Sequence, residues 1–188
     1  MSDKPKFPRA VALNVARAFC HALKPLCEWL IVAGSLRRRK EMVGDVEILY
    51  IPKTAEVRED FFDRRVVSQV DVKLDEWLQR GFIVKRLHVG GGVVSWGRWN
   101  KYARHVVSGV PVDFFATTAA AKWNYLVCRT GGEHSNLEVA SAAIRKGWKW
   151  NPTGEGFTDD HGAIIPVRSE RDVFEFVGLP YREPRERA

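Results

Sequence analysis

Apolar residues recur along this chain with two different periods, and these periods predict which segments form helices and which form strands. Between residues 9 and 24 they recur at helical spacing, for example at Val11, Val15 and Phe19. Between residues 44 and 51 they alternate with polar residues, as in a strand. On the same grounds we expect further helices over 71–79, 118–129, 133–146 and 169–177, and further strands over 28–33, 82–89, 102–107 and 110–116.

Residues that cap or break regular structure mark the ends of these elements. Pro25 ends the first helix, and Ser35 is expected to cap a short helix that runs through the arginines after it. Ser169 and Asp172 have the spacing of a capping box that opens the last helix. The stretch 54–69 is charged and weakly periodic, and we interpret it as a loop with some helix.

The order of the predicted elements indicates an α+β protein. Strands and helices mix up to Thr117 and helices dominate afterwards, so we expect domains over 1–117 and 118–188. The first would be a mixed sheet with flanking helices, and the second would be small and mostly helical. A chain of 188 residues is long enough to bury a substantial core in either arrangement.

The composition is that of an ordinary globular protein and narrows the choice of partners. Hydrophobic residues make up 45% of the chain and charged residues 28%. No apolar run approaches the roughly 18 residues of a membrane span, and the polar start of the chain is no signal peptide. We therefore expect a cytoplasmic monomer with no membrane partner, in the host-cell cytoplasm if the source is viral. The net charge of +7 and the pI near 9.5 favour a polyanionic partner.

Two carboxylates share one face of the strand predicted over 44–51. Successive side chains of a strand point to opposite faces, so Asp45 and Glu47 project together, about 7 Å apart along the strand. Such a pair is repulsive unless a cation joins it, and oxygen ligands suit a hard divalent ion such as Mg²⁺. The alternative is a surface strand with solvated acids.

The residues upstream of this strand suit a phosphate group. Gly34 lets a backbone approach a phosphate closely, and Ser35 can donate from its N–H and its hydroxyl. Arg37 and Arg38 offer planar guanidinium groups to phosphate oxygens. Phosphoryl and nucleotidyl transfer both use a phosphate-binding turn beside a pair of metal-binding carboxylates. This combination therefore favours a metal site over a surface strand with solvated acids.

A third carboxylate, Asp113, lies in an otherwise apolar strand. A buried unpaired carboxylate is costly, so its position is explained if it joins Asp45 and Glu47 at a metal site. The alternative is a hairpin acid that pairs with Arg104 or Lys101 across the strands.

With three carboxylates a mechanism with two Mg²⁺ ions can be written, for which Mn²⁺ could substitute. One ion, held by Asp45, Glu47 and Asp113, would lower the pKa of an attacking hydroxyl group. The second, held by Asp45, Glu47 and a nucleoside triphosphate, would stabilise the leaving pyrophosphate. Asp113, nearest the attacking oxygen in this layout, is the expected proton acceptor.

Taken together, these motifs resemble the DNA polymerase X (polymerase beta-like) family of the nucleotidyltransferase superfamily. The resemblance spans about residues 30 to 187. It is carried by the segments 34–38, 43–47 and 112–113, then by 130–136, Lys146-Gly147 and Asn151, and last by 169–170 and 177–187.

The resemblance implies a nucleotidyltransferase palm that bears the three carboxylates, followed by a nucleotide-binding subdomain of the thumb or fingers type. It implies that Gly34, Ser35, Arg38 and Gly44 hold the triphosphate. The positions that it places against the sugar and base of the nucleotide are Cys128, Gly131, Glu133 and Asn136. Only about thirty residues precede Gly34, so we expect a minimal form without the lyase and DNA-gripping domains of larger relatives.

Four positions depart from the family pattern. Glu47 stands where these polymerases carry Asp, and Pro111 stands where a basic residue often supports the third acid. Cys128 replaces an aromatic residue that excludes ribonucleotides, which suggests relaxed sugar selectivity. Ala140 replaces an arginine that reads the template, which bears on fidelity and on template use.

Basic and aromatic residues interleave after Gly90-Gly91-Gly92. A mobile loop of this kind can stack on bases and neutralise phosphates, and the candidates for DNA binding are Arg98, Trp99, Lys101 and Arg104. The alternative is an exposed hairpin with packed tryptophans.

The leading hypothesis is a metal-dependent DNA polymerase of family X type. It would extend the 3′-hydroxyl of a primer-template or gapped duplex with a nucleoside triphosphate and release pyrophosphate. One alternative is a nucleotidyltransferase that acts on a small molecule, a protein or tRNA, which Glu47 and Ala140 favour. The other is a non-catalytic nucleic-acid-binding module, which would gain nothing from clustered carboxylates.

Overall fold

The computed structural model describes residues 5–58, 64–87 and 94–187 and divides into two compact units. The first unit comprises Met1–Val32 and Met42–Ala116, and the second comprises Ala33–Glu41 and Thr117–Ala188. The short segment 33–41 thus belongs with the C-terminal part of the chain, although it lies inside the sequence range of the first predicted domain.

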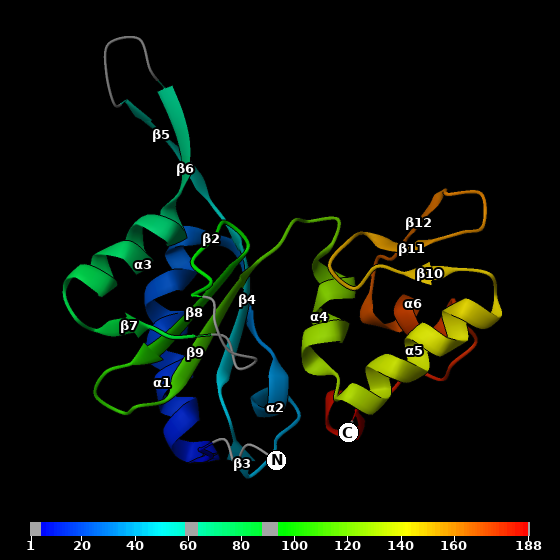
Figure 1. Ribbon diagram of the computed structural model, residues 1–188, viewed down its shortest axis with the longest axis horizontal. Helices are drawn as coiled ribbons and strands as arrows, with labels where there is room; N and C mark the ends of the chain where they lie inside the picture. The colour runs from blue at the N-terminus through cyan, green and yellow to red at the C-terminus, as the bar shows by residue number, and fades with distance from the viewer. Residues whose placement is uncertain (1–4, 59–63, 88–93, 188) are drawn as a thin grey trace. The chain divides into compact units, whose positions relative to one another are not determined.

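The first unit is built on a five-stranded mixed sheet (Figure 1). Its strands, in spatial order, are β2 (Cys27–Val32), β4 (Val46–Pro52), β9 (Pro111–Ala116), β8 (Asn100–His105) and β7 (Ile83–Lys85). β4 and β9 are parallel, and the other neighbours are antiparallel. Because β4 and β9 are parallel, both strands start at the same end of the sheet, and the predicted acids lie near that end.

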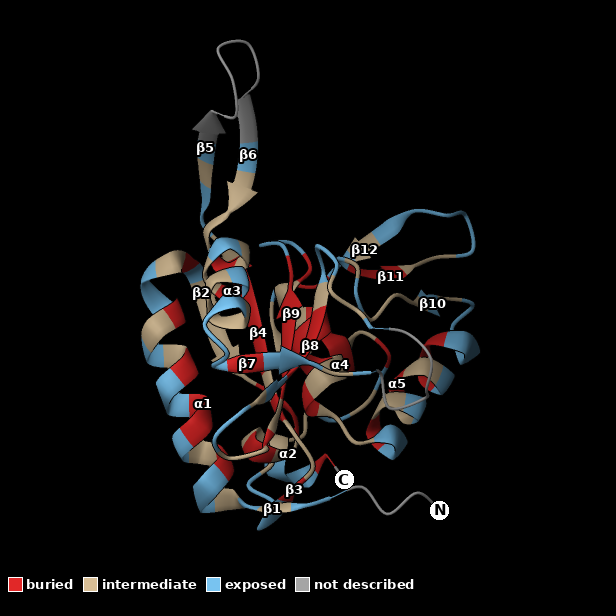
Figure 2. Cartoon of the chain, turned by 60° about the vertical axis from the view of Figure 1, so that its left-hand side comes forward, coloured by how far each residue is buried: buried red, intermediate tan, exposed pale blue. Residues whose placement is uncertain are grey.

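Two helices pack against this sheet, α1 (Arg9–Leu23) and α3 (Gln69–Gln79). The Phe19 ring of α1 makes edge contacts with Phe114 of β9 at 5.7 Å and with Trp77 of α3 at 5.0 Å between ring centroids. Figure 2 shows the buried residues gathered in the central strands and on the inward side of α1. The strand β1 (Phe7–Pro8) pairs with β3 (Met42–Val43), and the short 3₁₀ helix η1 (Lys24–Leu26) follows α1.

A hairpin of β5 (Thr54–Arg58) and β6 (Arg64–Ser68) projects from the rest of the first unit (Figure 1). The interpretation of 54–69 as a loop with some helix is therefore wrong for the described part. Backbone hydrogen bonds hold such a ribbon without an apolar face, so its sequence shows little hydrophobic period. The residues between the two strands, like Gly90-Gly91-Gly92 and the end of the strand predicted over 82–89, lie outside the described residues.

The second unit is mostly helical. It contains α2 (Gly34–Arg37), α4 (Lys122–Thr130), α5 (Glu133–Arg145) and α6 (Glu170–Glu175), the short strands β10 (Lys149–Trp150), β11 (Gly156–Thr158) and β12 (Ile164–Pro166), and the 3₁₀ helix η2 (Pro184–Glu186). Its core gathers apolar residues of α4, α5, α6 and β11, among them Val127, Val139, Phe157 and Phe174.

The α+β fold class is confirmed, as are most of the predicted elements. The capping box forms as expected, because the Ser169 hydroxyl accepts from the Asp172 N–H at 3.2 Å and the Asp172 carboxylate accepts from the Ser169 N–H at 3.1 Å. Ser35 differs, because it lies inside α2 and Ala33 is the N-cap. Among the described residues, none of the helices has both the length and the apolar character that crossing a bilayer requires.

Candidate active site

Two of the predicted acids lie directly opposite each other at the centre of the five-stranded sheet. Glu47 of β4 and Asp113 of β9 are register partners, and Asp113 is in turn opposite Tyr102 of β8. Register partners of neighbouring strands point to the same face and are about 4.8 Å apart along the sheet. Asp45 precedes β4 and lies two residues before Glu47. The first unit therefore pairs the two strands that carry Glu47 and Asp113, and Asp45 comes directly before one of them.

Asp113 is held by an arginine that the sequence did not single out. Arg86, directly after β7, donates from Nη2 to Oδ1 of Asp113 at 2.5 Å. From the sequence alone, the partners expected for a structural hairpin acid are Arg104 or Lys101. Lys101 instead pairs with Asp71 at 2.8 Å, and Arg104 is exposed. No local pattern indicates the role of Arg86, because the contact depends on the register of three strands.

The donor chemistry of these acids fits a hard divalent cation, since all their ligand atoms are carboxylate oxygens. Within residues 5–58, 64–87 and 94–187, however, no group of three or more His, Cys, Asp or Glu side chains has the arrangement of a metal site. The three carboxylates thus offer the right ligands but are not gathered around one point, and one oxygen of Asp113 is engaged by Arg86.

The predicted phosphate turn forms the start of α2 in the second unit. Gly34 has a positive φ of 64°, which favours glycine at this position, and Ser35 follows it in the helix. Arg38 donates from Nη1 to the carbonyl oxygens of Thr130 at 2.6 Å and Gly131 at 3.1 Å. This contact ties α2 to the turn between α4 and α5, so two of the predicted nucleotide motifs are joined through Arg38.

A buried acid with two arginines fixes the same region. Glu170 accepts from Arg37 at 2.7 and 2.6 Å and from Arg187 at 2.7 Å. Arg187 is fully buried, and its guanidinium lies over the rings of Phe174 and Tyr181 at 5.1 and 5.5 Å. No local sequence pattern indicates this network, since Arg37 and Glu170 are 133 positions apart in the chain.

The electrostatics of Glu170 reflect this enclosure. Burial alone would raise the pKa of the Glu170 carboxyl, but the hydrogen bond from Arg37 and the charges of Arg187 and Arg37 outweigh burial. The pKa is therefore lowered, and Glu170 is ionised in the folded protein at neutral pH.

The remaining predicted nucleotide residues lie around the start of α5, except Gly44, which belongs to the first unit. Asn136 donates from Nδ2 to the Cys128 carbonyl at 2.9 Å, and Glu133 is exposed in the first helical turn. A Cβ on Gly131 would lie 2.3 Å from Oδ1 of Asn136, so a larger residue here would displace the Asn136 side chain. The second unit thus brings Cys128, Gly131 and Asn136 together.

The four candidates for DNA binding separate into surface and interior residues. Arg98, Trp99 and Arg104 are exposed, and the Arg98 guanidinium lies 4.9 Å from the centroid of the Trp99 ring. Lys101 is only 3% exposed, and its ammonium group is used by Asp71 and by the Gly97 carbonyl. The Lys101 ammonium group is therefore paired within the first unit, in contrast to the DNA-binding role at the surface that was expected for it.

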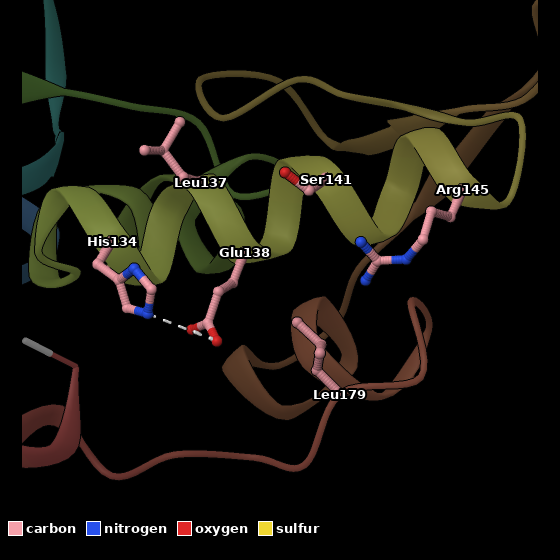
Figure 3. A pocket seen from close by; sticks show the side chains of 6 residues that line it. All are labelled: His134, Leu137, Glu138, Ser141, Arg145 and Leu179. Carbon is pink, nitrogen blue, oxygen red and sulfur yellow. Dashed lines mark ion pairs between the residues drawn. The ribbon is translucent and has the colours of Figure 1, made fainter.

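A pocket lies along α5 in the second unit (Figure 3). It is lined by His134, Leu137, Glu138, Ser141, Arg145 and Leu179. His134 is exposed, and its Nε2 lies 3.7 Å from the Glu138 carboxylate.

The sheet with paired carboxylates and the helical second unit have a polymerase beta-like fold that includes the thumb region. The family description "DNA polymerase beta thumb" matches residues 125–188. The crystal structure of Leishmania infantum polymerase beta, a ternary P/T complex, superimposes with a TM-score of 0.67 and 19% identity. The superposition covers 98% of this chain and 77% of the Leishmania infantum chain.

A curated relative extends the similarity over nearly the whole chain. DNA polymerase lambda of Rattus norvegicus is 27% identical over 206 residues, which cover 97% of this chain. The match spans 33% of that relative's own length. The thumb match and the fold agree with this similarity, so the chain resembles DNA polymerases beta and lambda in sequence and fold.

Proposed function

We propose that this protein is a family X DNA polymerase that transfers a nucleotide from a nucleoside triphosphate to a DNA 3′-hydroxyl group and releases pyrophosphate. The observation that carries the proposal is the cross-strand pair Glu47–Asp113, with Asp45 two residues before Glu47, on a polymerase beta-like sheet. Gap filling in a duplex is the proposed setting, with DNA and a triphosphate as the partners.

In this proposal the carboxylates have two roles, proton acceptance and metal binding. Asp113 accepts the proton of the attacking 3′-hydroxyl group, since the layout with two ions places this acid nearest the attacking oxygen. Asp45 and Glu47, with Asp113, would hold the divalent ion. A bound Mg²⁺ or Mn²⁺ ion supplies Lewis-acid stabilisation of the negative charge that develops at the phosphate.

The second unit supplies the nucleotide contacts. The backbone at Gly34 and the hydroxyl of Ser35 would bind triphosphate oxygens, with Arg38 fixing the turn that presents Gly131. Asn136 would face the nucleotide from the start of α5, where the first N–H groups of the helix have no partner within the helix. The Arg37–Glu170–Arg187 network keeps α2 in place for this task.

Primer extension with the purified protein tests the proposal. A labelled strand is offered alone, as a primer-template and with a one-nucleotide gap, with Mg²⁺ or Mn²⁺ and each dNTP or rNTP. We expect extension that follows the template base, with rNTPs accepted to a measurable extent because of Cys128. No extension on any strand by a folded protein contradicts the proposal.

A second candidate is a nucleotidyltransferase with another acceptor, such as tRNA or a small molecule. It is supported by the exposed surface of α5, where Leu137 is 58% exposed and Ile144 is 71% exposed, with Ala140 between them. An apolar surface at these positions offers no charged group for reading a template. Transfer of labelled nucleotide to an RNA or small-molecule acceptor, without extension of DNA, would favour this candidate.

A further inference from the structure

Arg86, Tyr102, Asp113 and Glu47 form one row across the sheet of the first unit. The Arg86 N–H donates to the Tyr102 carbonyl at 3.0 Å, so Arg86 continues the pairing of β7 with β8. Tyr102 is the register partner of Asp113, and Asp113 is the register partner of Glu47. Residues that are opposite each other in a sheet share a face, which places an arginine in line with two of the acids.

The contacts of Arg86 hold its guanidinium in one orientation. Its Nη2 donates to Asp113, its Nη1 donates to the Leu87 carbonyl at 3.2 Å, and the group lies 5.1 Å from the centroid of the Tyr102 ring. The side chains of Arg86 and Asp113 are 16% and 7% exposed. A charge-assisted hydrogen bond with so little solvent around it orients a carboxylate more strongly than a surface ion pair does.

The position two residues before Asp113 offers no such support. Residue 111 shares the face of Asp113, because side chains two apart on a strand point the same way. Pro111 occupies this position and has no side-chain donor. The arginine that orients Asp113 therefore comes from a different strand.

We propose that Arg86 is the positioning residue of Asp113, which aims this carboxylate at the attacking hydroxyl group from across β8. The proposal rests on the nucleotidyl transfer argued above and assigns a residue that its mechanism requires. It predicts that Arg86 acts on the rate of transfer rather than on nucleotide affinity, because it contacts the acid and not the triphosphate.

The rate test compares the wild type, Arg86→Gln, Arg86→Lys and the double variant Arg86→Gln/Pro111→Arg in single-nucleotide gap filling. We expect Arg86→Gln to lower kcat by about 10- to 100-fold, with KM for the dNTP changed by less than about threefold. Arg86→Lys should retain an intermediate kcat. The double variant should regain at least part of the lost rate, because it returns a guanidinium to the face of Asp113.

A second readout needs no turnover. Mn²⁺ is titrated into the DNA-free proteins by calorimetry, because removing a positive charge beside a carboxylate strengthens cation binding. We expect Arg86→Gln to bind Mn²⁺ at least about threefold more tightly than the wild type. Asp113→Asn in the same background should remove this gain.

The outcomes separate the two proposals. A wild type that extends no DNA contradicts the proposed function, and the Mn²⁺ titration then still decides whether Arg86 acts on Asp113. An active wild type with unchanged kcat in Arg86→Gln overturns the role of Arg86 alone. A lost rate that neither Arg86→Lys nor the double variant recovers, with Mn²⁺ binding no tighter, also overturns it and shows a merely structural residue.

Discussion

Carboxylates and arginines meet in both units, but in opposite proportions. In the first unit Asp113 pairs with Arg86 next to two further acids, Asp45 and Glu47. In the second unit a single acid, Glu170, pairs with Arg37 and Arg187. The first group has an excess of negative charge, and its acids Asp45 and Glu47 are half-buried. The second group has an excess of positive charge, and its Arg187 is fully buried.

The difference separates a candidate reaction centre from a structural anchor. The Arg187 side chain has no exposed surface, and both carboxylate oxygens of Glu170 accept from Arg37 or Arg187, so neither residue is available to an external ligand. Their ion pairs instead fix α2 and the C-terminal segment within the second unit. The three acids Asp45, Glu47 and Asp113, which we call the acidic row, favour the uptake of a cation, since neighbouring carboxylates repel each other. Changes to the two groups should therefore have different consequences.

The largest effect should follow the loss of a carboxylate from the acidic row. Asp45→Ala or Asp113→Ala should lower the rate of nucleotide transfer by about 10³-fold or more, because charge stabilisation of the reaction is lost. Quenched primer-extension time courses measure the rate, and circular dichroism checks that the fold is intact. A folded variant with near-normal transfer would exclude the acid from the site.

The corresponding change in the second unit should act on stability. Glu170→Gln leaves the buried charge of Arg187 without its counter-ion, which should cost about 3–5 kcal/mol of unfolding free energy. Urea denaturation measures the cost. Glu175→Gln is the matched control, because its pair with Arg171 is exposed and should contribute less than about 1 kcal/mol. Equal costs in the two variants would contradict the anchor role.

The same carboxylate predicts a dependence of stability on acidity. The pKa of Glu170 is lower in the folded protein than its ordinary value. Its stabilising contribution is therefore full above the ordinary glutamate pKa and is lost as the pH falls through the lowered folded value. The melting temperature of the wild type should therefore fall as the pH drops through this acidic range, and it should fall less in Glu170→Gln.

How far the sequence could predict these groups depends on the range of their interactions. The helix α5 and the capping box at Ser169 were predicted because period and spacing act within a few residues. The pairing of Arg86 with Asp113 was missed because it depends on strand register, and no residue near Arg86 indicates it. The hairpin β5–β6 was missed because backbone pairing requires little hydrophobic pattern.

A smaller effect is expected at the nucleotide turn. Gly131→Ala places a Cβ where Oδ1 of Asn136 lies, so it should displace the Asn136 amide from the Cys128 carbonyl. We expect KM for the dNTP to rise about 10-fold, which corresponds to a loss of roughly 1.4 kcal/mol in nucleotide binding. Steady-state kinetics measure KM. Gly97→Ala is the control, since a Cβ there meets no atom within 4 Å, and it should leave KM unchanged.

The smallest effect should come from the exposed pair Arg98–Trp99. Arg98→Gln should weaken DNA binding a few-fold and reduce the salt dependence by about one phosphate contact. Trp99→Ala should weaken binding with little change in salt dependence, because it removes stacking alone. Fluorescence anisotropy at several salt concentrations distinguishes the two. Unchanged affinity in both variants would remove this surface from the DNA interface.

The central claim is that the acidic row drives nucleotidyl transfer to DNA. The most direct test is a single-turnover reaction on one-nucleotide-gapped DNA that follows primer extension and pyrophosphate release together, in the wild type and in Asp113→Ala. We predict one pyrophosphate for each extended primer in the wild type, directed by the template base, and neither product in the variant. Extension that persists in Asp113→Ala, or a folded wild type that yields neither product, would contradict the account.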